Sequence, residues 1–463
     1  MSLHYISTRG LSPKASFEDV LLAGLAPDGG LYLPETWPRL SATEIGDLRR
    51  TTDYVTVATD ILFRFAAGSF TRDEIAADVA AAYSGFDDPT IVPLETLAPG
   101  LHLLELFHGP TLAIKDLALQ VLGRLFARAL LRRGGKATVV VATSGDTGSA
   151  AIAALGGLPN IEVFVLHPLN RVSEVQRRQM TTSPHANVHN IALQGTFDDA
   201  QSLVKDLFAD TDFARAVSLT AVNSINFARI AAQAVYYFTA SRSGDNAIFV
   251  VPTGNFGDVF AGEAAMRMGL PIAKLVIATN ANDILARALN EGVYARGAVH
   301  ASLSPSMDIQ VASNFERALF EASNRDAPWL REAMAGFARD GRLVIPPPVL
   351  ASLRARYAAF ACDDALTVET MARVKRDFGE IVDPHTAIAF AAALPRWQAK
   401  EGNVIVLSTA HPAKFPDAVA QATGAPPPVP DRLKGLFDLP ERLEILPNDK
   451  ALVRAHIESK LGA

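Results

Sequence analysis

The sequence predicts an α/β protein in which parallel β-sheets are covered by helices, preceded by a mainly helical N-terminal lobe. Short β-branched runs alternate with helical patterns from about residue 101 onward, which is typical of parallel sheets covered on both faces. Before residue 96 the chain instead carries amphipathic stretches near 16–25, 53–66 and 72–84. The two patterns together predict a helical lobe joined to α/β lobes.

The expected strands are separated by helical segments, as parallel strands require. Residues 300–400 are helix-rich, and a proline-rich connector at 425–431 leads to a C-terminal helix near 449–461. The expected strands are 101–107, 138–143, 161–167, 187–193, 217–222, 247–253, 274–280 and 404–410.

Composition favours a globular protein that acts on small molecules. Of 463 residues, 49% are hydrophobic and 20% charged, and 43 Lys and Arg against 49 Asp and Glu give a net charge of -6. This balance offers no general electrostatic reason to bind nucleic acid or acidic membrane. The single cysteine, Cys362, excludes an intramolecular disulfide, and no segment resembles a signal peptide or a membrane helix. We therefore expect a cytoplasmic location.

A single lysine stands at an expected junction between a strand and a helix. Residues 107–116 read FHGPTLAIKD, in which a Gly-Pro turn and a short apolar pair precede Lys115. Helical spacing of apolar residues follows, up to Gly134. A helix N-terminus and apolar surroundings both disfavour the ammonium form, so Lys115 is a candidate nucleophile. The alternative is a solvated lysine at a helix start.

Three further stretches follow expected strands, where open parallel sheets place their ligands. TSGDTGSAA (143–151) offers small residues and hydroxyls at a helix start, although a capped helix also explains it. In PTGNFGD (252–258), two glycines around an asparagine let successive backbone N–H groups line a phosphate site, the alternative being a plain glycine turn. VLSTAHPAKF (406–415) is a strand ending in two hydroxyls. A neutral lysine, a phosphate-binding loop and such hydroxyls together fit pyridoxal 5'-phosphate, whose aldehyde forms a Schiff base with lysine.

These residues belong to motifs by which the chain resembles the threonine synthase family of pyridoxal-phosphate enzymes, which has the tryptophan-synthase-β type of fold. The motifs stand in family order and span residues 5–415, so the resemblance covers nearly the whole chain. They are YISTRG (5–10), GLAPDGGLYLPE (24–35), LFHGPTLAIKD (106–116), ATSGDTGSAA (142–151), QGTFDDAQ (194–201), NSINFARI (223–230), PTGNFGD (252–258), SPSMDI (304–309), SNFER (313–317), DPHTA (383–387) and STAHPAKF (408–415).

The resemblance implies a pyridoxal-phosphate-dependent fold of type II, with two interleaved lobes of parallel-type sheets flanked by helices. We expect a mainly helical N-terminal lobe at 1–95, a larger cofactor-binding lobe at 96–136 and 216–424 with a helix-rich insertion at about 300–380, a smaller substrate-loop lobe at 137–215, and a connector with a C-terminal helix at 425–463.

The resemblance also implies which residues hold the cofactor. Lys115 would bind it covalently and then move protons as general base and acid. The backbone N–H groups of Gly254, Asn255, Phe256 and Gly257 would bind its phosphate, and Gly257 could require a positive φ. Thr409 would hydrogen-bond the pyridine nitrogen in preference to Ser408, and Asp146 would orient its loop or the phenolic oxygen of the cofactor.

Two groups of residues are expected to bind the substrate. Ser144 and Thr147 would receive its carboxylate. Asn226 is a natural N-cap, which places Arg229 near the positive end of the following helix, where its fork matches a phosphate. The resemblance favours Asn223, Ser224 and Arg229 as this phosphate clamp over a surface arginine behind an N-cap. Lys414 is a second, weaker candidate cation.

The implied reaction converts O-phospho-L-homoserine and water to L-threonine and phosphate by γ-elimination and β-addition. A phospho-lyase that releases 2-oxobutyrate, or a serine/threonine dehydratase that needs no Arg229 clamp, would use the same cofactor apparatus. A non-catalytic threonine-synthase-like protein is a further alternative, against which Lys115 and Thr409 weigh. We expect a small-molecule substrate, no nucleic acid or membrane partner, and a monomer or small homo-oligomer.

The histidines do not predict a metal site. His185 and His189 are four residues apart, but Pro184 and the β-like run after it argue against a shared helix face. The motif residues His108, His385 and His411 could equally hold other groups in place or transfer protons, while Met307, Phe315 and Cys362 are expected to pack.

Overall fold

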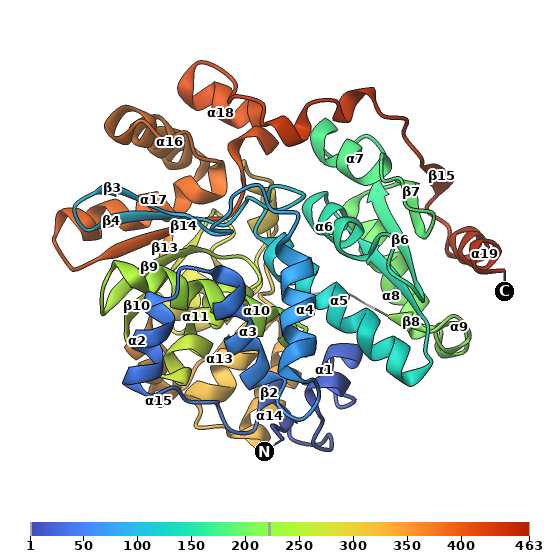
Figure 1. Ribbon diagram of the computed structural model, residues 1–463, viewed down its shortest axis with the longest axis horizontal. Coiled ribbons are helices and arrows are strands. Elements are labelled where there is room, and N and C mark those ends of the chain that lie inside the picture. The colour runs from blue at the N-terminus through green and yellow to red at the C-terminus, as the bar shows by residue number, and fades with distance from the viewer. Residues whose placement is uncertain (1, 221–223, 463) are drawn as a thin grey trace. The chain divides into compact units, whose positions relative to one another are not determined.

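The computed structural model describes residues 2–220 and 224–462, and the chain forms two compact units (Figure 1). Unit 1 comprises Met1–His108 and Ser224–Pro427, and unit 2 comprises Gly109–Asn223 and Pro428–Ala463. Each unit has its own sheet and its own apolar core. Within the described residues, no helix is both long enough and apolar enough to cross a bilayer.

Unit 1 is built on a six-stranded sheet that is parallel except at one edge. Its strand order is β13 (Tyr357–Ala361), β10 (Ile272–Thr279), β9 (Ala247–Pro252), β14 (Val404–Ser408), β4 (Leu101–Glu105) and β3 (Leu94–Ala98), with β3 antiparallel to β4. The central strands β9 and β14 are buried throughout, so both faces must be covered.

Alternate residues of these strands pack against helices on opposite faces. Ile248 and Val250 join a core with α16 (Asp364–Phe378) and α17 (Pro384–Gln398). The residue between them, Phe249, packs against Tyr237 of α10 (Phe227–Ala240), with the two tilted rings 4.9 Å apart between centroids. The carboxyl ends of β9 and β14 therefore emerge between two helical layers, which places residues 253–257 and Thr409 at one edge of the sheet.

The remaining elements of unit 1 include the mainly helical N-terminal region. They are β1 (Tyr5–Ser7), α1 (Phe17–Ala23), β2 (Tyr32–Pro34), α2 (Ala42–Arg50), α3 (Tyr54–Phe65), α4 (Arg72–Tyr83), α11 (Gly257–Met268), α12 (Ile284–Glu291), β11 (Val293–Ala295), α13 (Phe315–Ala322), α14 (Ala327–Asp340), β12 (Arg342–Val344), α15 (Pro347–Arg356) and α18 (Pro416–Thr423). The ring of Phe227 lies within 6.1 Å of those of Tyr5, Trp37 and Phe65, so aromatic packing joins α10 to the N-terminal elements.

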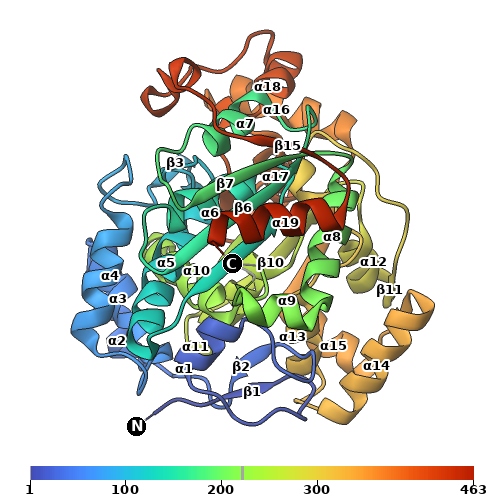
Figure 2. The same cartoon turned by 90° about the vertical axis from the view of Figure 1, so that its right-hand side faces the viewer.

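Unit 2 is built on a five-stranded, all-parallel sheet. Its strand order is β15 (Glu444–Pro447), β7 (Val188–Gln194), β6 (Ile161–Pro168), β5 (Ala137–Ala142) and β8 (Leu219–Thr220). One face carries the helices α8 (Phe197–Ala209), α9 (Thr211–Ala216) and α19 (Lys450–Leu461), as Figure 2 shows for α19 against β6 and β7. The other helices of the unit are α5 (Lys115–Arg133), α6 (Asp146–Leu155) and α7 (Glu174–Thr181).

Helices α5 and α6 pack closely because α5 has a glycine at the contact. A Cβ on Gly123 would lie 2.8 Å from the carbonyl oxygen of Ala154, so only glycine permits this approach. Since α5 and α6 begin with Lys115 and Asp146, this packing brings two candidate site residues together.

The expected helices and strands are confirmed, and the described residues form seven further strands, of which β1, β2, β11 and β12 make two small two-stranded sheets. The segment 217–222 forms only β8 within the described residues. Strands β3, β13 and β15 were not predicted, because β3 is a half-exposed edge, β13 is alanine-rich and β15 lies in a polar segment. We expected residues 96–136 to belong to the larger lobe. In the structure, residues 109–136 are grouped with unit 2, in which α5 contacts α6.

Arg317 of α13 joins three segments of unit 1. Its guanidinium donates to the carbonyl of Tyr32 at 3.1 Å, to the side chain of Asn314, and to the carbonyl of Ile225 at 2.6 Å. The residue is fully buried, and this desolvation lowers its pKa to about 9. The buried cation is satisfied by dipoles of the backbone and of an amide.

Replacing Arg317 is expected to destabilise the fold. Arg317→Leu removes three hydrogen bonds to groups of the protein interior, so we expect the free energy of unfolding to fall by about 3 kcal/mol or more in urea titrations. The exposed Arg376 offers a matched control, and Arg376→Leu should change the free energy of unfolding by less than about 0.5 kcal/mol. Equal midpoints for both variants would contradict this role for Arg317.

Candidate cofactor and substrate site

The loop between β9 and α11 is held from one side by Asn314. The backbone N–H of Asn314 donates to the carbonyl of Asn255 at 3.0 Å, and its side-chain amide donates to the same oxygen at 3.1 Å. A Cβ on Gly254 would lie 3.1 Å from the carbonyl oxygen of Ser306. The first N–H groups of a helix have no partner within it, so the start of α11 offers donors to an anion.

The left-handed residue of this loop is Phe256 and not Gly257. Phe256 has φ of 65°, whereas Gly257 is the first residue of α11 and has no positive φ. Our expectation for the φ of Gly257 was therefore wrong. Space is also tight there, since an added Cβ would lie 3.3 Å from the side-chain nitrogen of Asn314.

A half-buried aspartate side chain follows this loop directly. Asp258 accepts hydrogen bonds from the hydroxyls of Tyr236 and Tyr237, which fixes the start of α11 against α10. Burial raises the pKa of Asp258 to about 6, although the hydrogen bonds from the two tyrosine hydroxyls lower it in part. This side chain was not a predicted site residue.

The two hydroxyls after β14 differ in their contacts. Ser408 is buried, and its oxygen lies 3.1 Å from that of Thr386, which donates in turn to Asp383. Thr409 is half-buried, and its hydroxyl has no hydrogen-bond partner among the described residues. Thr409 therefore has its donor available for a ligand, which supports the choice of Thr409 over Ser408.

The motif histidines of unit 1 are hydrogen-bonded to nearby groups. His108 Nε2 lies 2.7 Å from a carboxylate oxygen of Glu105, and His385 Nδ1 lies 2.6 Å from one of Asp383. His411 Nδ1 accepts from a backbone N–H at 3.1 Å, and burial lowers the pKa of this imidazole. In the described part of the chain, no three His, Cys, Asp or Glu side chains gather as a metal site requires.

In unit 2 Lys115 lies beside a carboxylate. Its Nζ is 3.4 Å from Oδ2 of Asp146, whose Oδ1 accepts from Gln176 at 3.0 Å. The expected apolar surroundings of Lys115 are thus corrected: Asp146 is buried next to it, and both residues begin helices. The sequence did not predict Gln176, because its capping-box spacing to Ser173 indicates only a helix start.

The loop before α6 leaves two hydroxyls available. Thr143 Oγ1 accepts from the N–H groups of Gly145 and Gly148, both at 2.9 Å, and Gly145 takes φ of 137°. Ser144 is exposed and Thr147 half-buried, and neither hydroxyl is hydrogen-bonded within the part of the chain that is described. These side chains can therefore bind a polar ligand group.

Arg229 is a buried cation near the start of α10. Asn226 caps this helix by accepting from Ala228 N at 3.0 Å, which confirms its predicted role. Arg229 is only 7% exposed, burial lowers its pKa to about 10, and no ion pair to it exists among residues 2–220 and 224–462. A buried guanidinium without a carboxylate is costly unless an anion binds there.

The other predicted phosphate ligands have different surroundings. The hydroxyl oxygen of Ser224 lies 3.3 Å from that of Ser313. Asn223 lies outside the described residues. Lys414 is fully buried in the turn after β14.

Three family models match the chain, and together they extend from residue 4 to residue 457. Threonine synthase N terminus matches residues 4–83, pyridoxal-phosphate dependent enzyme matches 89–409, and threonine synthase, C-terminal matches 386–457. Threonine synthase of Pseudomonas aeruginosa is 47% identical, with 98% of both chains covered. The chain belongs to the threonine synthase family. That of Corynebacterium glutamicum is 40% identical over 98% of both chains.

Solved structures of the threonine synthase family share this fold. The pyridoxal-phosphate-bound threonine synthase from Brucella melitensis superposes with a TM-score of 0.97 at 46% identity, covering 100% of both chains. The yeast threonine synthase gives 0.95 at 38%, covering 100% of this chain and 99% of that one. The predicted fold type and the predicted cofactor are thereby confirmed.

The loop 254–257 offers a test of the cofactor site. Gly257→Val would drive a branched side chain into Asn314, which holds the loop. We expect the dissociation constant of pyridoxal phosphate, measured by absorbance titration of the apoprotein, to rise at least tenfold. Gly336→Val on α14 is the control, because an added Cβ there would meet only the end of the Arg339 side chain, at 3.9 Å. Equal affinities in both variants would remove the loop from the site.

Proposed function

We propose that the chain catalyses the reaction of its family: O-phospho-L-homoserine and water give L-threonine and phosphate. The observation that carries this choice of substrate is Arg229, a buried guanidinium without an anionic partner in the described residues. A substrate without a phosphate group would leave the positive charge of Arg229 uncompensated.

The proposed cofactor-binding residues provide three kinds of contact. Lys115 has a primary amine for covalent attachment. The N–H groups of residues 254–257 are donors to a phosphate, and the Thr409 hydroxyl is available to the pyridine nitrogen. We assign Asp146, held by Gln176, to orienting the amine of Lys115.

Bound pyridoxal phosphate serves as an electron sink that makes the protons at Cα and Cβ of an amino acid removable. The Lys115 amine, once free of the cofactor, would take the Cα proton and move protons at Cβ and Cγ, because its point of attachment places it beside these atoms. Phosphate leaves Cγ with its bridging oxygen, Cγ gains a proton, and a water oxygen adds at Cβ.

The substrate would be held at both ends. Ser144 and Thr147 donate to the carboxylate, since their hydroxyls have no other partner in the described residues. Arg229, with Ser224 and Asn223, binds the phosphate, and a cation there also stabilises the charge on the leaving group. We further propose a cytoplasmic enzyme that acts as a monomer or small homo-oligomer.

Lys115→Ala should abolish covalent attachment of the cofactor while the fold persists, because it removes the amine and no core side chain. Borohydride reduction followed by intact-mass measurement should show one cofactor on the wild type and none on this variant. Lys136→Ala, at an exposed position, should retain the adduct. An adduct on Lys115→Ala would place the attachment at another residue.

Arg229→Ala should impair use of the phosphorylated substrate. Loss of a desolvated charge pair costs on the order of 2 to 5 kcal/mol, so we expect kcat/KM for O-phospho-L-homoserine to fall at least about a hundredfold, partly in kcat. Arg229→Lys should recover only part of the lost kcat/KM, because an ammonium group lacks the paired donors of a planar guanidinium.

Cofactor absorbance and threonine binding should remain as in the wild type, since neither involves the substrate phosphate. Arg376→Ala provides an exposed control. If Arg229→Ala instead loses the cofactor and keeps its substrate preference, Arg229 is structural and the clamp must be sought at Lys414.

A further inference from the structure

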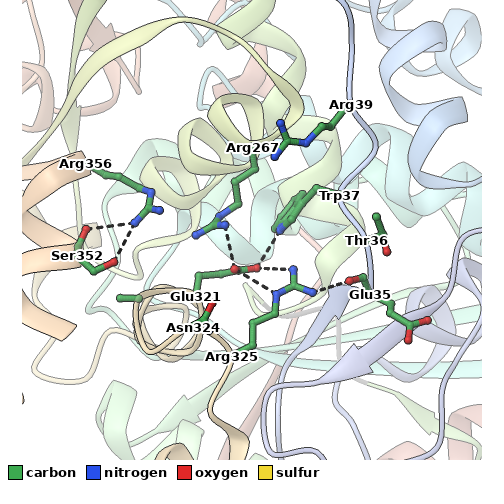
Figure 3. A pocket seen from close by; sticks show the side chains of 11 residues that line it. Glu35, Thr36, Trp37, Arg39, Arg267, Glu321, Asn324, Arg325, Ser352 and Arg356 are labelled. Atoms are coloured by element: carbon green, nitrogen blue, oxygen red, sulfur yellow. Dashed lines mark hydrogen bonds and ion pairs between the residues drawn. The ribbon is translucent and has the colours of Figure 1, made fainter. Parts of the chain in front are cut away.

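A hollow of about 440 Å³ in unit 1 is lined by four arginines (Figure 3). Arg39 lies between β2 and α2, Arg267 in the last turn of α11, Arg325 after α13, and Arg356 at the end of α15. Four guanidinium groups around one hollow are unusual, because like charges at close range repel.

Two buried carboxylates neutralise only part of this charge. Glu321 binds Arg267 at 3.0 Å and Arg325 at 2.7 Å, and Glu263 binds Arg267 at 2.6 Å. The lining carboxylate of Glu35 pairs with Lys14 at 2.6 Å, and Figure 3 shows it turned away from the arginines. Four arginines against Glu321 and Glu263 leave two positive charges unmatched.

Arg39 and Arg356 carry these unmatched charges. Arg39 has no hydrogen bond or ion pair within the described residues, and Figure 3 shows its guanidinium directed toward Arg267. Arg356 reaches Glu263 only at 3.7 Å and donates through Nη1 to Ser352, so its Nη2 remains available.

The floor between these two arginines is rigid. The indole N–H of Trp37 donates to Glu321 at 2.9 Å, and the Arg267 guanidinium lies over the ring of Trp37 at 6.0 Å. All three nitrogens of Arg267 contact carboxylates, which fixes its orientation. The charges of this rigid floor are balanced, so the two guanidinium groups beside it, those of Arg39 and Arg356, are the ones available to the oxygens of a multivalent anion.

We propose that this hollow binds a small polyanion carrying two or more negative charges on carboxylate or phosphate groups. It is separate from the proposed cofactor loop, because Gly257 and Arg267 stand at opposite ends of α11, roughly 15 Å apart at 1.5 Å per residue. The site is also independent of Arg229, so it does not depend on the proposed reaction.

Calorimetric titration of the holoenzyme at low ionic strength tests this site, with citrate and inorganic phosphate as separate probes. Phosphate is titrated in an Arg229→Ala background, so that the proposed substrate site does not contribute. We expect one site per chain for at least one probe, and the probe that binds more tightly identifies carboxylate or phosphate as the preferred group.

Arg39→Gln and Arg356→Gln should each weaken binding at least about tenfold, the loss expected for one charge-assisted contact. Arg39→Glu should abolish it. Arg339→Gln, which removes an exposed charge on α14, should bind as the wild type does. Because Arg39 has no partner in the described residues, its replacement leaves the fold intact.

Three results would overturn the proposal. The first is no binding of either probe tighter than about 1 mM. The second is equal binding by wild type and both Arg39 variants. The third is citrate binding that is lost in Arg229→Ala alone, which would assign the anion to the proposed substrate site. None of these results bears on whether the protein forms threonine.

Discussion

The double hydrogen bond from Asn314 to the carbonyl of Asn255 fixes the loop that begins α11, and much of unit 1 is arranged around it. Asn314 is also the residue before α13, so one residue connects the start of α13 to the loop before α11. Arg317 donates to the side chain of Asn314 and to the carbonyl before Asn226, the N-cap of α10. A loop that approaches a phosphate through its backbone can select that ligand only if its N–H groups are held in place, and these contacts hold them.

Two buried arginines in unit 1 show how charge is used differently for structure and for binding. Burial lowers the pKa of both, to about 9 for Arg317 and about 10 for Arg229. Backbone and amide dipoles satisfy Arg317, so its charge stabilises the fold. Arg229 has no such set of acceptors in the described residues, so the protein sustains the cost of an uncompensated cation until an anion binds. In the role proposed for Arg229, that cost would make the site selective for a phosphorylated substrate.

Sequence reasoning identified the features that depend on local pattern. Continuous β-branched runs predicted the buried strands, and the junctions after them contained Lys115, the 254–257 loop and Thr409. Contacts between distant segments could not be predicted in this way. Lys115 contacts Asp146, 31 positions away, because α5 and α6 pack together at Gly123. It also placed the positive φ on Gly257, because glycine usually takes that conformation, whereas Phe256 adopts it here. Asp258 was not predicted as a site residue, because its two tyrosine partners lie on α10 and not near it in the sequence.

Product accounting with the wild-type holoenzyme in water enriched in oxygen-18 tests the central claim most directly. O-Phospho-L-homoserine is added, and phosphate, threonine and 2-oxobutyrate are measured in one sample. The account predicts equal amounts of phosphate and threonine, with the label in the threonine hydroxyl and absent from the released phosphate, because phosphate leaves with its bridging oxygen and water adds at Cβ. Release of 2-oxobutyrate in place of threonine, or labelled phosphate accompanied by homoserine, would contradict it.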